Sequence, residues 1–140
     1  MNNIIIRPMR ESDYDNAVAL WSTTAGIGLS EADSRTDIHS YLARNPKMSQ
    51  LAEIKGQLVG AVLCGHDGRR GYLHHLAVAL PFRKIGIGRL LVESCMKRLA
   101  REGIARCHLF VYPDNEQGLA FWQKMGFEQR RDIQLCSRNL

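Results

Sequence analysis

The sequence lacks long apolar runs, closely spaced cysteine pairs and basic runs interleaved with aromatic residues. Of its 140 residues, 45% are hydrophobic and 24% are charged, which is ordinary for a soluble globular protein. No stretch approaches the roughly 20 apolar residues that span a bilayer. The N-terminus lacks the basic start and long apolar core of a signal peptide. We therefore expect a single cytoplasmic domain over residues 1–140, with no membrane contact.

The spacing of the cysteines and the distribution of charge argue against a metal site and against a nucleic-acid partner. The cysteines, which never form a C-x-x-C motif, are Cys64, Cys95, Cys107 and Cys136. We expect reduced, mostly buried thiols and no metal site. The formal charge of +5 would suit nucleic acid, a phosphorylated cofactor or an acidic substrate. Because the positive charges are dispersed and match no common nucleic-acid module, we expect no nucleic-acid partner.

Hydrophobic periodicity predicts an α/β fold. Strands are predicted over residues 4–7, 49–54, 57–66, 72–78, 106–112 and 127–138. The first helix is predicted to begin after Ser12 or Asp13, and the second after Asp33 or Ser34. A third helix should follow the glycine loop at residues 83–89 and end at Glu102-Gly103, and a fourth should span residues 116–125. The order is β-α-α-β-β-β-α-β-α-β. Strands 72–78 and 106–112 should run parallel because a helix connects them. We predict a mixed central sheet with helices on both faces.

The most informative stretch, residues 71–101, reads as a strand, a basic glycine loop and a helix. The loop residues are Arg83, Lys84, Ile85, Gly86, Ile87, Gly88 and Arg89. The start of a helix has unpaired N–H groups and partial positive charge, and glycines let a ligand approach the backbone. The loop therefore predicts a phosphate or pyrophosphate site. The alternative is that Gly86 and Gly88 only shape a tight turn beside a solvated basic patch.

Two common phosphate-binding motifs do not fit this loop, and a third does. The chain has no G-x-x-x-x-G-K-[ST], and Leu91 stands where a dinucleotide fingerprint has its third glycine. Arg83-x-x-Gly86-x-Gly88 resembles the acyl-CoA loop [RQ]-x-x-G-x-[GA] of the GNAT superfamily of N-acetyltransferases. Further segments similar to that family are Leu76-Ala77-Val78, Leu90-Leu91, and the downstream set Asn115, Ala120, Lys124, Gly126 and Phe127, at the spacing N-x-x-x-x-A-x-x-x-K-x-G-F.

The resemblance implies a GNAT-like sheet with splayed parallel central strands and acetyl-CoA as co-substrate. It implies that the pantetheine arm lies between strands 72–78 and 106–112, and that backbone groups of Leu76 and Val78 pair with it. The cofactor-binding residues implied are Leu76, Ala77, Val78, Arg83, Lys84, Ile85, Gly86, Ile87, Gly88, Arg89 and Asn115. For Asn115, a helix N-cap is an equal and compatible alternative.

The implied reaction is direct acetyl transfer to a primary amine of a small molecule or a protein. His74 is the candidate general base, since a histidine pKa near ~6.5 suits that role. The alternative is a packed strand histidine. His75 should point to the opposite face of the strand, so at most one of the two should face the acceptor. Glu53, Glu102 and Glu128 are weaker candidates.

No residue is an obvious proton donor for the leaving thiolate. Many family members have a tyrosine four residues before the glycine of the Gly-Phe pair, where this chain has Trp122. Indole N–H is no proton source at neutral pH, so Tyr112, a water molecule or unaided departure would have to serve. Trp122 would then line the acetyl pocket or pack in the core. This departure supports a second hypothesis, a catalytically weak acyl-CoA-binding regulatory module.

The acceptor should contact the 26–30 loop, the second helix and Trp21. Asp33 and Asp37 could serve an amine there, or could only favour the helix dipole. An exposed last strand over residues 127–138 is compatible with a homodimer.

Overall fold

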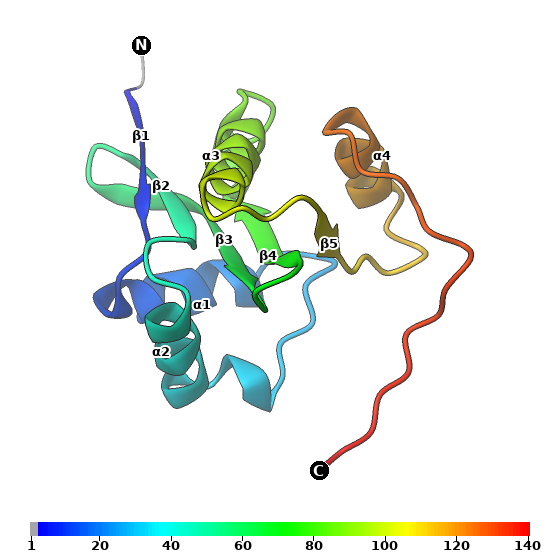
Figure 1. The fold of residues 1–140 in the computed structure, drawn as a ribbon. Coiled ribbons are helices and arrows are strands. Elements are labelled where there is room, and N and C mark those ends of the chain that lie inside the picture. The colour runs from blue at the N-terminus through cyan, green and yellow to red at the C-terminus, as the bar shows by residue number, and fades with distance from the viewer. Residues whose placement is uncertain (1–2) are drawn as a thin grey trace. The chain divides into compact units, whose positions relative to one another are not determined.

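The computed structural model describes residues 3–140, which divide into one unit ending at Phe110 and a second unit of Val111–Leu140. The elements of the first unit are β1 (Ile4–Pro8), α1 (Tyr14–Ser22), α2 (Arg35–Arg44), β2 (Gln50–Ile54), β3 (Gln57–His66), β4 (Gly71–Val78), α3 (Ile87–Arg101) and β5 (Cys107–Leu109) (Figure 1). Short 3-10 turns lie at Glu11–Asp13, Glu31–Asp33 and Leu80–Phe82. The second unit holds α4 (Glu116–Lys124).

The five strands of the first unit form one mixed sheet in the order β1-β2-β3-β4-β5. The first four strands pair antiparallel, and β4 and β5 pair parallel, which confirms the predicted mixed sheet. The parallel pairing runs only from Gly71 opposite Cys107 to Leu73 opposite Leu109. Residues 74–78 of β4 extend past this pairing, so β5 leaves them an open edge. That opening is the splay between the two parallel strands.

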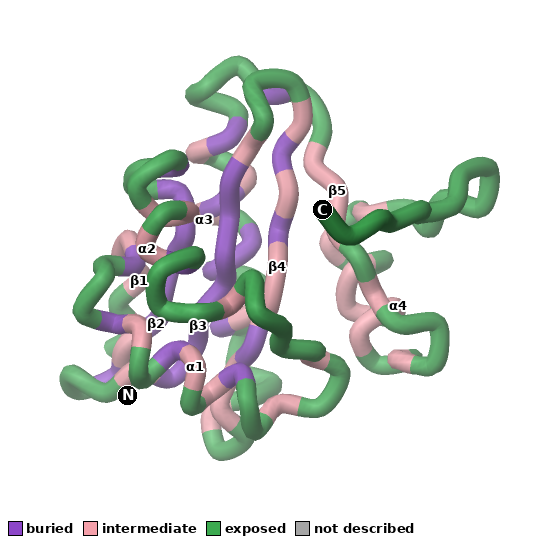
Figure 2. Tube along the Cα trace, turned by 90° about the horizontal axis from the view of Figure 1, so that it is seen from below, coloured by how far each residue is buried: buried purple, intermediate pink, exposed green. Residues whose placement is uncertain are grey.

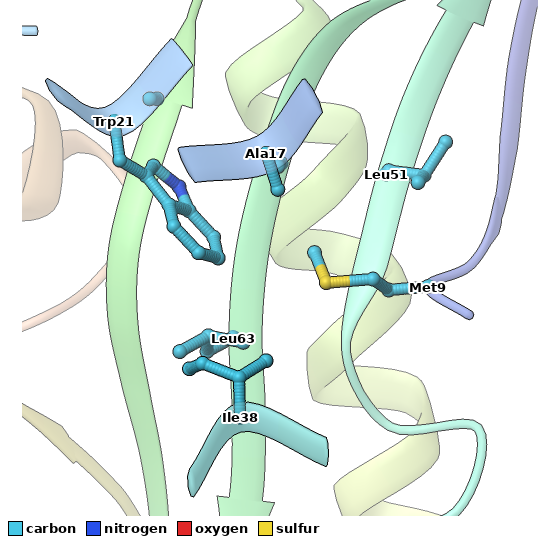
Figure 3. Packing of buried hydrophobic residues seen from close by; sticks show 8 residues of the cluster. Met9, Ala17, Trp21, Ile38, Leu51 and Leu63 are labelled. Atoms are coloured by element: carbon cyan, nitrogen blue, oxygen red, sulfur yellow. The ribbon is translucent and has the colours of Figure 1, made fainter. Parts of the chain in front are cut away.

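Helices cover both faces of the sheet, as predicted. On one face, α1 and α2 close over a buried apolar cluster that contains Met9, Ala17, Trp21, Ile38, Leu51, Ala61, Leu63 and Ala77 (Figure 3). On the other face α3 lies close to β3, since a Cβ at Gly60 would stand 3.0 Å from Leu91 Cδ1. Figure 2 shows β3 buried along most of its length, whereas β4 alternates between buried and half-buried residues. The side chains of β4, which lies between β3 and the edge strand β5, are therefore less deeply buried than those of β3.

An ion-pair network joins β1, β2 and the turn before α1. Arg7 donates to both carboxylate oxygens of Asp13 at 2.8 Å and to Glu53 Oε1 at 2.7 Å. Burial opposes ionisation of Asp13, but the bonds from Arg7 and from the Arg10 N–H prevail and lower its pKa. Asp13 is the residue before α1, as predicted, although its carboxylate binds Arg7 and Arg10 instead of capping the helix. Glu53, a weak base candidate, is engaged in this network.

The predicted last strand is wrong. Residues 127–140 contain no regular secondary structure, and Ile133 and Leu135 are 58% and 70% exposed. Local alternation of apolar residues cannot create a strand without a partner to receive its N–H and C=O groups. Residues 127–138 therefore offer no strand edge through which two copies could pair as predicted. The rest of the predicted element order matches the structure through α4.

The cysteines are free thiols, and half of them are buried. Cys64 and Cys95 are buried, Cys107 is half-buried and Cys136 is exposed, so the expectation of mostly buried thiols holds only for the first two. Burial raises the pKa of the Cys107 thiol to about 12, which keeps it neutral. Among the helices of residues 3–140, none has the length and apolar character to cross a membrane.

Candidate active site

A bulge in β4 lies where its pairing with β5 ends. The β3–β4 register passes from Ala61 opposite Ala77 to Leu63 opposite His74, so β4 has one extra residue there. His75 sits in this bulge with φ of 58°, a left-handed conformation that is uncommon for a residue with a side chain. Strained backbone of this kind is often found at functional sites.

The bulge brings the two histidines to the same face. The His74 ring meets Tyr41 of α2 edge-on at 6.3 Å between centroids, and the His75 ring packs on Trp21 of α1 at 5.3 Å. The two imidazole centroids are 6.4 Å apart. The prediction that they point to opposite faces is wrong, because the extra residue breaks the alternation on which it relied.

Asp33 holds His75 in place. Its Oδ1 lies 2.8 Å from His75 Nε2, and the two side chains are only 10% and 17% exposed. Asp33 is fixed in turn, since its Oδ2 accepts from the Ser30 N–H at 3.0 Å and its carbonyl accepts from the Tyr14 hydroxyl at 2.6 Å. When Nε2 carries the proton toward Asp33, His75 Nδ1 is left as a proton acceptor.

The carboxylate–imidazole pair could not be read from the sequence. Asp33 and His75 are 42 residues apart, and only folding brings the start of α2 to the bulge. The sequence singled out Asp33 as an acidic residue near a helix start. Its capping box with Ser30 was a local signal that this side chain is fixed, but it did not name the partner.

His74 is set up as a neutral imidazole. Burial lowers its pKa below the ordinary histidine value, the adjacent His75 lowers it further, and Asp33 opposes both effects. A neutral imidazole can accept a proton or line an apolar surface. The structure therefore brings both histidines to the splayed end of the sheet as competing candidates for the base.

The glycine loop has the features that an anion requires. Gly86 is the residue before α3, with φ of 94° and no side-chain cap on the helix. A Cβ placed there would meet nothing within 4 Å, so the space beside it is open. The first N–H groups of α3, from Ile87 onward, have no partner within the helix. Arg83, Lys84 and Arg89 are exposed around the loop, which adds positive charge. This geometry fits a pyrophosphate.

Beside the loop, the free edge of β4 holds the implied pantetheine residues. Leu76, Ala77 and Val78 belong to the segment past the β5 pairing. The Val78 carbonyl accepts a hydrogen bond from Arg83 Nε at 2.8 Å, which ties the loop to this edge. An extended chain carrying amide groups could pair with such an edge as a strand does.

The second unit holds Tyr112, Asn115 and Trp122. Asn115 caps α4 by accepting from the Gly118 N–H at 3.0 Å, which confirms its predicted N-cap role. Trp122 packs edge-on against Phe121 and Phe127, with centroids 5.0 and 5.2 Å apart, as a packing residue does. Tyr112 is 55% exposed. The cofactor contact of Asn115 and the catalytic roles of Tyr112 and Trp122 stay predictions.

One predicted acceptor contact is wrong. Trp21 is fully buried in the apolar cluster (Figure 3). Its ring packs against His75 and offers no surface to an acceptor. In the 26–30 loop, Ile27 is half-buried and Leu29 is 37% exposed.

Comparisons with known proteins agree with this fold. The chain is 32% identical over 133 residues to an acetyltransferase of Pectobacterium atrosepticum, a match that covers 95% of this chain and 94% of the relative. The PaiA N-acetyltransferase of Thermoplasma acidophilum, solved in complex with coenzyme A, superposes with a TM-score of 0.80 at 21% identity, over 94% of this chain and 93% of that one. Naa50 of Arabidopsis thaliana, in complex with the bisubstrate analogue CoA-Ac-MVNAL, gives 0.71 at 23% identity, over 89% and 83%.

A sequence model of a known protein family also matches most of the chain. Residues 14–127 match the model described as the acetyltransferase (GNAT) family, a span that runs from the start of α1 to beyond α4. It includes the bulge, the glycine loop and the downstream segment. The chain therefore belongs to the GNAT family of acetyltransferases.

Proposed function

We propose that this protein is an N-acetyltransferase that transfers the acetyl group of acetyl-CoA directly to a primary amine of a small molecule or a protein, in the cytoplasm. The observation that carries the proposal is the Asp33–His75 pair, at 2.8 Å, beside the splayed end of β4 and β5. A fixed carboxylate–imidazole pair is an arrangement suited to removing a proton from a nucleophile. The N-acetyltransferase named among the solved relatives supports an amine as the acceptor.

Acetyl-CoA, the co-substrate, supplies the acetyl group as a thioester. The chain would hold the pyrophosphate with backbone N–H groups from Lys84 to Arg89, and the pantetheine with backbone groups of Leu76 and Val78. The cofactor set proposed is Leu76, Ala77, Val78, Arg83, Lys84, Ile85, Gly86, Ile87, Gly88, Arg89 and Asn115. Most of these contacts would involve backbone atoms, which explains why glycines occupy the key positions.

His75 is the base in this proposal. A primary amine with a pKa near ~10.4 arrives protonated, so a group on the enzyme must take that proton before nitrogen can attack. Asp33 keeps the imidazole in one orientation and balances the positive charge that forms on it. The carbon–nitrogen bond then forms, the carbon–sulfur bond breaks, and a backbone N–H near Val78 polarises the carbonyl. His74 lies beside this base as a neutral wall of the acceptor site.

The thiolate leaves with a proton from water or from Tyr112. A thiol pKa near ~8.5 makes the thiolate a fair leaving group, so the reaction does not require a strong acid. Trp122 packs among aromatic residues and would contribute no proton.

The proposal can be tested by incubating the protein with acetyl-CoA and a panel of primary amines and peptides. Mass spectrometry then detects any acetylated product. We expect at least one amine to be acetylated.

The second candidate function, a catalytically weak acyl-CoA-binding regulatory module, is favoured by Trp122 at the usual tyrosine position. Tight acetyl-CoA binding without product from any acceptor would establish that second function instead.

The glycine loop can be tested with a pair of matched substitutions. We expect Gly86→Ala to weaken acetyl-CoA binding about tenfold, because an alanine resists the left-handed backbone that aims the N–H groups of α3 at the ligand. Gly103→Ala is the control. Gly103 has φ of 80° and the same open surroundings, but it follows the other end of α3. Titration calorimetry with CoA should show weaker binding for Gly86→Ala alone. Equal loss in both variants would mean that only general backbone strain is being measured.

The contribution of Asp33 to catalysis can be tested by the effect of its substitution on kcat. We expect Asp33→Asn to lower kcat at least tenfold, because an amide cannot balance the charge on a protonated imidazole. Acetyl-CoA affinity and melting temperature should change little, since the side chain keeps its shape. Asp37→Asn serves as the control, because Asp37 is an exposed acidic residue in the first turn of α2. A fall in stability that matches the fall in kcat would reduce Asp33 to a structural contact.

A further inference from the structure

Four aromatic side chains line the α1/α2 face of β4 and β5. Tyr72 and His108 are register partners with centroids 5.8 Å apart. Phe110, just after β5, stacks on Tyr72 and on His74, at 6.4 Å in each case and with planes within 22° of parallel. His74 and Tyr72 are stacked as well, 7° from parallel. The four rings form one continuous surface, which we call the aromatic platform.

The aromatic platform is open and adjoins the base. Phe110 is 58% exposed, and Tyr72, His74 and His108 are half-buried. The His74 ring ends the platform only 6.4 Å from the His75 ring. A group that lies on the platform therefore places its neighbouring atoms beside the proposed proton acceptor.

The charge around the platform selects among amines. None of the four platform residues carries a carboxylate, and Asp33, the acidic residue that contacts the adjacent His75, is committed to that histidine. A polycationic amine would have to give up its water with no negative charge to replace it. A flat apolar group loses little by leaving water and gains stacking on the rings.

We propose that the aromatic platform of Tyr72, His74, His108 and Phe110 binds the acceptor, and that the preferred acceptors are primary amines with an aromatic ring close to the amino group. This rests on the proposed function, because it names the acceptor of the same site. The competing explanation is that the rings only stabilise the β4–β5 edge. A stabilising role would alter the melting temperature without altering the choice between amines.

The test compares phenethylamine, hexylamine and spermidine as acceptors for the parent protein and for Phe110→Ala. We expect kcat/KM to favour phenethylamine over hexylamine by about tenfold in the parent, the size of one good ring–ring contact, and to disfavour spermidine. Phe110→Ala should remove most of that preference through KM. Phe110→Tyr should restore it, because it restores the ring. Ile5→Ala, which truncates an exposed apolar residue on the far edge strand, should keep the parental preference.

Two results would overturn the platform as the acceptor site: a preference that Phe110→Ala leaves unchanged, or spermidine as the best acceptor. If no amine is acetylated, the proposed function fails but the platform is still tested. Titration calorimetry of phenethylamine into the CoA-saturated protein should then show binding that Phe110→Ala weakens about tenfold. Absence of binding to the parent would overturn it.

Discussion

Replacing His75 with glutamine is expected to lower kcat by about 10²- to 10⁴-fold, the usual contribution of a general base. Glutamine keeps a polar side chain that can bond Asp33, but it cannot accept the amine's proton. The His75 side chain packs on Trp21, lies beside His74 and bonds Asp33, whereas the cofactor contacts proposed for β4 and the loop are mostly backbone, so acetyl-CoA affinity should be unchanged. Steady-state kinetics with saturating acetyl-CoA measure the loss, and calorimetry checks the affinity.

His74→Gln is the matched comparison for the assignment of the base. It changes the adjacent residue on the same face and removes a neutral ring of the aromatic platform, so we expect a higher KM for the amine and a loss in kcat of less than about tenfold. If His74→Gln reduces kcat more than His75→Gln does, the base is His74, as the sequence first indicated, and the Asp33–His75 pair is structural.

Replacing Trp21 with alanine is expected to destabilise the protein by about 3–5 kcal/mol, the usual range for a large buried aromatic residue. Trp21 is completely buried within the cluster that joins α1 to the sheet, so truncation leaves a cavity that its neighbours cannot fill (Figure 3). Urea unfolding followed by circular dichroism measures the change.

Trp21→Phe distinguishes packing from hydrogen bonding. The indole Nε1 has no hydrogen-bond partner in the part of the chain described, so Trp21→Phe loses side-chain volume but no hydrogen bond. We expect a cost below about 1.5 kcal/mol. A loss from Trp21→Ala of under about 1 kcal/mol would contradict the view that α1 is held mainly by this side chain.

Much of the fold followed from local patterns. The apolar spacing of Tyr14, Ala17, Val18 and Trp21 predicted one face of α1, and the structure buries Ala17 and Trp21 on it. The Lys55-Gly56 turn predicted the β2–β3 hairpin, where both residues have positive φ. The glycine loop was recognised because its function depends on backbone conformation, which glycine positions reveal directly.

The catalytic geometry could not be predicted, because it depends on tertiary contacts. A single extra residue in β4 reverses the alternation beyond it, and nothing in the residues around His75 signals that bulge. The bond from Asp33 to His75 joins a helix start to a strand, and the aromatic platform requires the β4–β5 register. The predicted strand over residues 127–138 does not form because a strand pattern also needs a partner strand, and none of residues 3–140 pairs with this segment.

The most direct test follows CoA thiol release and amine acetylation together, in one reaction containing acetyl-CoA and phenethylamine, with the parent protein and with His75→Gln. We expect thiol and acetylated amine to appear in equal amounts with the parent, and both rates to fall by at least about 10²-fold in the variant. Equal rates in the two proteins, or thiol release without acetylated amine, would contradict it.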